Sequence, residues 1–158
     1  MKRIDFERIE EENYLYDVCE LLFNKYFNPA DDQELKSFER EIWMIGSEII
    51  ENIRKAKRTK IFTEALLQDL LKVINQRKYG RGRESFVMLL HYFKNSPNIE
   101  KYIAPLLDDE QLYAFAIGEL IQLKIFSHTD KVRAILSKEK IAWRKKEVQK
   151  YIEKSNGW

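Results

Sequence analysis

Residues 99–123 have the sequence IEKYIAPLLDDEQLYAFAIGELIQL, and this stretch decides how the whole chain is interpreted. An apolar segment ends at Leu107, a polar break follows at residues 108–111, and a second apolar segment repeats from Leu112 at every fourth residue. Apolar residues at this spacing form a stripe along one face of an α-helix. The stretch therefore predicts a helical hairpin, in which two helices are joined by a short polar turn.

The same order of features occurs three times in the second half of the chain. The apolar anchors are Ile74, Leu107 and Leu136, and each is followed by a polar break and then by a further helical stripe. The anchors lie about 30 residues apart, a period typical of repeats in which each unit is one supersecondary element. The repetition predicts that residues 59–158 form about three similar helical hairpins.

These residues resemble HEAT repeats, the paired antiparallel helices of an α-solenoid, over about residues 60–154. The middle unit carries the resemblance in its PLL segment, its DDE turn and the A-I-x-x-L-x-x-L pattern of its inner helix, and KYGRGRESFVMLLHYF and AWRKKEVQKYI are similar to HEAT units of small bacterial proteins. The resemblance implies a right-handed α-solenoid. Its inner helices, at residues 82–94, 110–124 and 139–154, would form one concave face.

The N-terminal part predicts a helical pair that caps the repeats, so we expect residues 1–158 to form a single domain with a cap at residues 1–58. Apolar residues from Leu35 to Ile53 recur in steps of three and four, which predicts a long helix over residues 33–56. Residues 4–27 predict either one kinked helix or two helices, ended by Pro29. Further on, Gly80 and Gly82 indicate either a positive φ or a close approach of helices.

Composition favours an all-α protein without a membrane segment. The chain is 44% hydrophobic and 34% charged, with only 5 Gly and 3 Pro among 158 residues. Charged residues interrupt every apolar run, and acidic residues occupy the place where a signal peptide would have its apolar core. We therefore expect a cytoplasmic protein with no membrane contact. The single cysteine, Cys19, lies in a helical stripe and is expected to be a buried thiol.

Charge is divided unevenly along the chain. Residues 1–52 contain 6 Lys and Arg against 14 Asp and Glu, whereas residues 53–158 contain 22 against 12. This asymmetry has two interpretations: the basic half binds nucleic acid, or the two halves attract each other within one fold. We favour the second, since ion pairs between helices need no external partner.

The sequence contains no pattern typical of catalysis, of a metal site or of a cofactor site. His91 and His128 have no neighbour at metal-ligand spacing, and no zinc, redox or serine-hydrolase motif is present. The acidic residues 108–110 fall at the start of an inner helix, where carboxylates cap free N–H groups. HEAT-like DNA glycosylases are the one enzyme class considered, and no aspartate here matches theirs.

Taken together, these features favour a non-catalytic scaffold that binds a protein or peptide partner, with an immunity or antitoxin role as a narrower form of it. Nucleic-acid binding through the basic half, including a DNA glycosylase-like repair role, is the alternative. Arginines, a lysine and aromatic residues on the expected inner helices and turns are the candidate contacts. They are Arg81, Arg83, Tyr113, Phe115, Trp143, Arg144 and Lys145.

Overall fold

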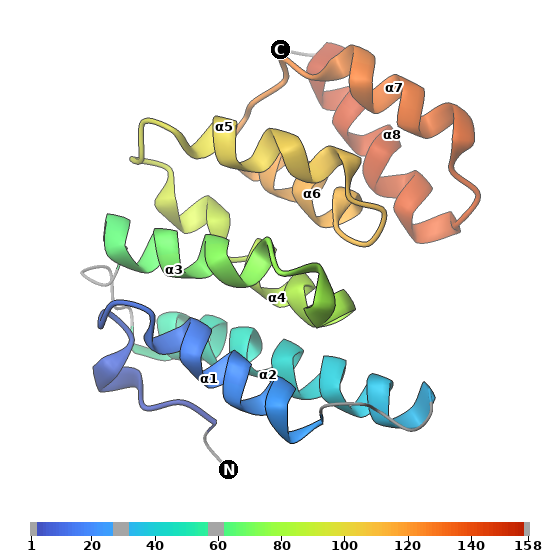
Figure 1. The fold of residues 1–158 in the computed structure, drawn as a ribbon. Helices are drawn as coiled ribbons and strands as arrows, with labels where there is room; N and C mark the ends of the chain where they lie inside the picture. Colours follow the sequence, from blue (N-terminus) through green and yellow to red (C-terminus); the bar gives the residue numbers. More distant parts are fainter. Residues whose placement is uncertain (1–2, 27–31, 57–61, 157–158) are drawn as a thin grey trace. The chain divides into compact units, whose positions relative to one another are not determined.

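The computed structural model describes residues 3–26, 32–56 and 62–156, and within these ranges every regular element is a helix (Figure 1). The all-α prediction is therefore confirmed. The chain divides into two compact units, Met1–Phe93 and Lys94–Trp158. The ending assigned to Pro29 and the border of the expected cap at residue 58 lie outside the described residues.

The first unit is built around one long helix. Its elements are η1 (Phe6–Arg8), α1 (Tyr14–Lys25), α2 (Asp32–Ala56), α3 (Glu64–Ile74), η2 (Arg77–Arg83), α4 (Glu84–Val87) and η3 (Leu90–Phe93), where η denotes a 3-10 helix. The helix expected over residues 33–56 is confirmed as α2, and Ile42, Ile45 and Ile49 on its stripe are buried. The first residue of that stripe, Leu35, remains 41% exposed. Of the two alternatives for residues 4–27, the structure has separate elements, η1 and α1.

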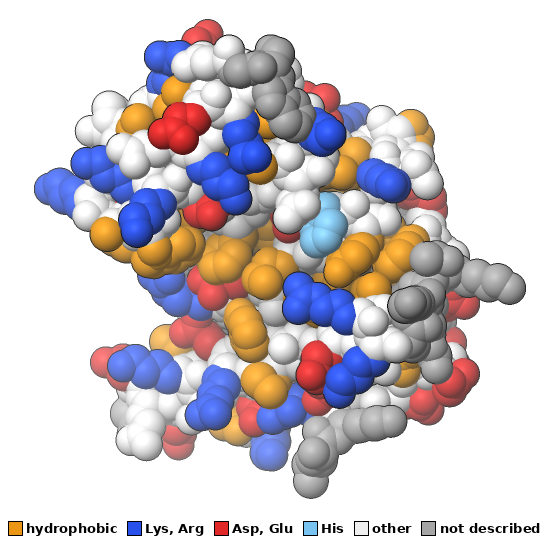
Figure 2. Space-filling model, turned by 180° about the vertical axis from the view of Figure 1, so that it is seen from behind, with side chains coloured by type: hydrophobic (Ala, Val, Ile, Leu, Met, Phe, Trp, Pro, Cys, Tyr) orange, Lys and Arg blue, Asp and Glu red, His pale blue; other side chains and the backbone are white. Residues whose placement is uncertain are grey.

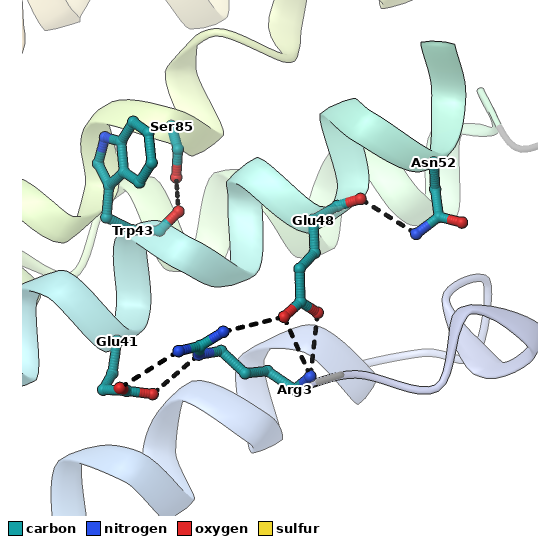
Figure 3. A network of polar contacts seen from close by, with 6 residues as sticks. All are labelled: Arg3, Glu41, Trp43, Glu48, Asn52 and Ser85. Carbon is teal, nitrogen blue, oxygen red and sulfur yellow. Dashed lines mark hydrogen bonds and ion pairs between the residues drawn. The ribbon is translucent and has the colours of Figure 1, made fainter. Parts of the chain in front are cut away.

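The two alternatives expected for Gly80 and Gly82, a positive φ and a close approach of helices, both occur in the structure. Gly80 has φ +57°, which L side chains rarely adopt, and a Cβ on Gly82 would lie 2.7 Å from Cβ of Ile42 on α2. A third glycine, Gly46 on α2, makes room for Ser85 on α4, whose hydroxyl donates to the Trp43 carbonyl at 2.7 Å (Figure 3). Glycine therefore lets η2 and α4 pack closely on α2.

Arg3 joins the N-terminal segment to α2 through two carboxylates. Its Nε donates to Glu41 at 2.8 Å, and its backbone N–H and Nη1 donate to Glu48 at 3.0 Å and 3.1 Å (Figure 3). The hydrogen bond from the Arg3 guanidinium to Glu41 lowers the pKa of the Glu41 carboxyl. One arginine thus bridges carboxylates two turns apart on the same helix.

A buried carboxylate caps α1 from outside its own sequence. Asn13, at the start of α1, makes no capping hydrogen bond, but Asp69 on α3 accepts from the backbone N–H groups of Leu15 at 2.9 Å and Tyr16 at 3.3 Å. The side chain of Asp69 therefore satisfies two of the N–H groups that a helix start leaves free. Cys19 lies deeper in the same helix and is fully buried, as expected.

The second unit contains two helical hairpins (Figure 1). Its elements are α5 (Ile99–Ile103), η4 (Ala104–Asp108), α6 (Tyr113–Gln122), α7 (Thr129–Lys138) and α8 (Ala142–Asn156). Helix α6 packs on η4 and on α8, and α7 packs on α8. Tyr151 on α8 bonds to the loop that connects the two hairpins. Its hydroxyl donates to the Ile125 carbonyl at 2.9 Å and accepts from the His128 N–H at 3.2 Å.

The expected inner helices differ from the observed elements mainly in the first repeat. The helix expected at residues 82–94 is split into α4 and η3. Residues 85–87 and 89–90 are all buried, so this stretch has no polar face to set against an apolar stripe. In the second repeat, α5 gives way to η4 because Pro105 has no backbone N–H to continue the helix.

Candidate binding site

The structure places the candidate contacts in two separate units. Arg81 and Arg83 belong to η2 of the first unit. The remaining five lie on two helices of the second unit that pack on each other: Tyr113 and Phe115 on α6, and Trp143, Arg144 and Lys145 on α8.

Within the first unit, Arg83 has a structural role, because its side chain is buried and bonded to the backbone. Its side chain is 2% exposed, and its Nε and Nη1 donate to the carbonyls of Gly80 at 2.8 Å and Ile74 at 2.9 Å. These bonds tie η2 to the end of α3. Arg81 is exposed and forms an ion pair with Glu84 at 3.7 Å, while its backbone N–H donates to the Glu39 carboxylate.

In the second unit, four of the five candidates form one cluster of aromatic and cationic groups. The rings of Phe115 and Trp143 lie with centroids 5.6 Å apart. The guanidinium carbon of Arg144 lies 5.4 Å from the ring centroid of Tyr113 and 5.4 Å from that of Trp143. Its Nη1 is 3.4 Å from the Tyr113 hydroxyl. Lys145 is exposed beside this cluster.

The register of α8 explains why neighbouring residues in this cluster differ so much in exposure. Arg144, Val148 and Tyr151 are its buried residues, at i, i+4 and i+7. Arg144 therefore occupies a core position at 8% exposure, whereas Trp143 lies about 100° around the helix and is 45% exposed. Trp143 therefore faces away from the buried stripe of α8.

An open pocket of about 530 Å³ adjoins the cluster. Residues 107–110 and Tyr113 line it from the end of η4, the turn that follows and the start of α6. Ile135, residues 138–141 and Arg144 line it from the end of α7, the turn that follows and the start of α8. Its volume is within the range of small-ligand sites. Ile141, which lines the pocket, has a side chain that is 43% exposed.

Three of the four carboxylates in the pocket wall have structural partners. Asp108 pairs with Lys131, Asp109 accepts from the Gln111 N–H at 3.0 Å, and Glu139 accepts from the Ile141 N–H at 3.0 Å. The prediction that the acidic cluster caps the inner helix is not confirmed, because α6 starts at Tyr113 with no side-chain cap and no acidic residue in its first turn. Asp109 instead stabilises the turn that leads into α6.

Arg144 is the exception among the charged groups of the pocket. Among the described residues, no carboxylate lies within ion-pair distance of its guanidinium, and its polar contact is the Tyr113 hydroxyl. A buried cation is ordinarily paired, because removing a charge from water is costly.

The histidines and the cysteine have structural surroundings. His128 contacts Glu100 at 3.0 Å, and the hydrogen bond from Ser127, followed by this contact, lowers the pKa of that carboxyl. The His91 ring packs on Tyr92 with centroids 4.2 Å apart. Burial raises the pKa of the Cys19 thiol, which disfavours the reactive thiolate. Within the described ranges, no three His, Cys, Asp or Glu residues are grouped as a metal site.

Compared with protein-family models, with curated proteins and with solved structures, the chain matches none of them. Among the helices in the described ranges, none has the length and apolar character needed to cross a bilayer.

Sequence reasoning selected the aromatic and cationic cluster but not the pocket beside it. Lys138, Glu139, Lys140 and Ile141 belong to the pocket wall, yet in the sequence they are simply the polar break between two helices. The available signal was Ile141, an apolar residue in a charged turn. The burial of Arg144 was also accessible, since its spacing to Val148 and Tyr151 is that of a helical stripe.

Proposed function

We propose that this chain is a non-catalytic binding scaffold of HEAT-like helical hairpins that recognises a protein or peptide partner. The contact surface is the α6–α8 face, defined as Tyr113, Phe115, Ile141, Trp143, Arg144 and Lys145. The two hairpins of the second unit, joined through α6 and α8, support the HEAT-like assignment. A free, buried Cys19 supports a reducing cytoplasmic setting.

One observation carries the proposal: two large apolar side chains remain exposed beside a buried arginine. Trp143 is 45% exposed and Ile141 is 43% exposed, and Ile141 lines the same pocket as Arg144. Tryptophan, tyrosine and arginine are the residues most enriched in the energetic centres of protein interfaces. Tyr113 and Trp143 both hold the guanidinium, so all three residue types converge at one place.

The test is capture of partners from the native cell extract with the full-length chain as bait. Trp143→Ala removes the exposed ring from the α6–α8 face. Leu21→Ala is the matched control, because Leu21 is a large apolar residue that is 71% exposed on α1. We expect proteins that bind the wild-type chain and Leu21→Ala, but not Trp143→Ala. Equal capture by all three baits would refute the assignment of this face.

Nucleic-acid binding is the second candidate, and α8 carries the observation that favours it. Lys145, Lys146 and Lys150 are exposed on the helix that presents Trp143, and aromatic rings beside cations stack bases and hold phosphates. On the face drawn in Figure 2, however, basic side chains are interspersed with acidic ones. A mobility shift on single-stranded or duplex DNA at low salt tests this candidate, and no shift would exclude it.

A further inference from the structure

The strongest unexplained feature of the second unit is the unmet hydrogen-bonding capacity of Arg144. A guanidinium has five N–H donors, and here one nitrogen has a contact, at 3.4 Å from the Tyr113 hydroxyl. That distance exceeds the 2.7–3.2 Å usual for N–H···O bonds. Among the described residues, the Ser96 hydroxyl oxygen is the one fully buried side-chain oxygen or nitrogen that has no hydrogen-bond partner. The N–H donors of Arg144 that have no partner are therefore not fully buried, and solvent reaches them. Arg144 is also one of the residues that line the pocket.

Arg83 shows what an arginine with a structural role looks like in the same protein. It is similarly buried, but its guanidinium donates at 2.8 Å and 2.9 Å to two backbone carbonyls. Arg144 is held instead by the Tyr113 and Trp143 rings, whose contacts orient a guanidinium plane without using its N–H groups. A guanidinium held in this way is preorganised to receive a ligand with two acceptor oxygens.

The pocket wall limits which anion fits. It contains four carboxylates, on Asp108, Asp109, Glu110 and Glu139, against the three cations of Lys138, Lys140 and Arg144, and Asp108 is in turn paired with Lys131 of α7. A phosphate group, with a charge near −2 at neutral pH, would be repelled by this wall more strongly than a singly charged carboxylate. A carboxylate also matches the guanidinium fork with its two oxygens.

We infer that the pocket receives the carboxylate of an aspartate or glutamate side chain from a partner protein, in bidentate contact with Arg144. The exposed Ile141 and Trp143 adjoin the position of that carboxylate, so the partner segment carries an apolar side chain next to its acidic residue. This inference rests on the proposed function and adds the chemistry of the group that the α6–α8 face recognises.

The probe is 4-phenylbutyrate, which combines one carboxylate with an apolar tail, titrated into the full-length 15N-labelled protein. The side-chain Nε–H signal of Arg144 in the 1H–15N spectrum is the readout, and it is assigned by its loss in Arg144→Gln. For a ligand of this size, we expect a saturable shift with a Kd on the order of millimolar. Arg133→Gln is the control, because Arg133 is exposed on α7 and absent from the pocket wall.

Two further titrations identify the group that binds. With 4-phenylbutan-1-ol, which lacks the carboxylate, we expect at least a tenfold weaker response, and with inorganic phosphate no saturable shift. An equal response to the alcohol would overturn the carboxylate assignment in favour of apolar binding. A stronger response to phosphate would overturn it in favour of a phosphate ligand. The absence of any shift with 4-phenylbutyrate would remove the site.

The outcome is separable from that of the capture experiment. If 4-phenylbutyrate does not bind but capture still depends on Trp143, the α6–α8 face remains a binding surface and the carboxylate assignment is wrong. If 4-phenylbutyrate binds at Arg144 but no protein is captured through Trp143, the anion site remains and the proposed function fails.

Discussion

Replacing each of the two buried arginines with methionine should have opposite consequences for stability. Arg83→Met removes hydrogen bonds from a charged donor to the carbonyls of Ile74 and Gly80. Bonds of this kind contribute about 1.5–3 kcal/mol each, and the two carbonyls would stay buried without these donors. Methionine recovers about 1.5–3 kcal/mol through apolar burial. We expect a net loss of about 2–4 kcal/mol of unfolding free energy.

Arg144→Met should leave stability nearly unchanged. The substitution removes two ring contacts, which contribute about 0.5–1 kcal/mol each, and one long contact with the Tyr113 hydroxyl. Against this loss, methionine avoids the cost of removing most of an unpaired cation from water and keeps apolar contacts with both rings. The two effects are similar in size, so we expect a change within about 1 kcal/mol.

Urea unfolding followed by far-UV circular dichroism measures both variants, and hydrogen exchange assigns the loss to one unit. The assignment is needed because a chain with two compact units need not unfold in a single transition. Arg83→Met should increase exchange in residues 62–93, and Arg144→Met should leave exchange in residues 99–156 close to that of the wild type. If Arg144→Met lost as much stability as Arg83→Met, Arg144 would be a structural residue and the argument for an anion site would fail.

Three further predictions concern the first unit. Asp69→Ala should cost about 1–3 kcal/mol, since it leaves two N–H groups at the start of α1 without an acceptor, and Asp69→Asn should cost less in the same urea assay. Glu41→Gln should cost about 0.5–1 kcal/mol at pH 7. The hydrogen bond from Arg3 lowers the pKa of Glu41, so this stabilisation is present above the unfolded-state pKa and is lost as pH falls through the folded-state pKa. The unfolding midpoints of the wild type and Glu41→Gln should therefore converge as the pH falls below the folded-state pKa of Glu41. Gly80→Ala should cost about 1–3 kcal/mol, because alanine is strained at φ +57°, and a thermal melt at the wild-type midpoint would contradict this.

Regular, amphipathic elements were the part of the fold that the sequence predicted well. The long helix expected over residues 33–56 begins and ends within one residue of α2, because its apolar stripe and its charged face agree along its whole length. The helix expected over residues 82–94 is split in the structure, and its central part, residues 86–93, is apolar at every position except His91. Periodicity then carries no information about which residues face inward.

The candidate site was predicted in part for a related reason. A helical stripe indicates burial, whereas the residue types of Arg83 and Arg144 are those typical of contacts, so the two signals conflict at both positions. The structure shows both to be buried, and only their hydrogen-bond partners distinguish a fold residue from a pocket residue. Such partners come from elements distant in the sequence, and spacing along one helix does not reveal them.

The charge of the pocket wall separates the two candidate functions by their response to salt. Asp108, Asp109 and Glu139 lie at the turns of the two hairpins and line the same pocket as Arg144, so they also place negative charge near its guanidinium. A partner that contributes one carboxylate to such a wall gains little from long-range attraction. Its affinity should therefore fall only slightly when the salt concentration rises from about 50 to about 200 mM. Nucleic acid bound along the lysines of α8 would release several counterions, and its affinity should fall by orders of magnitude over the same interval. The turns that hold the hairpins together thus also determine which kind of partner the α6–α8 face would accept.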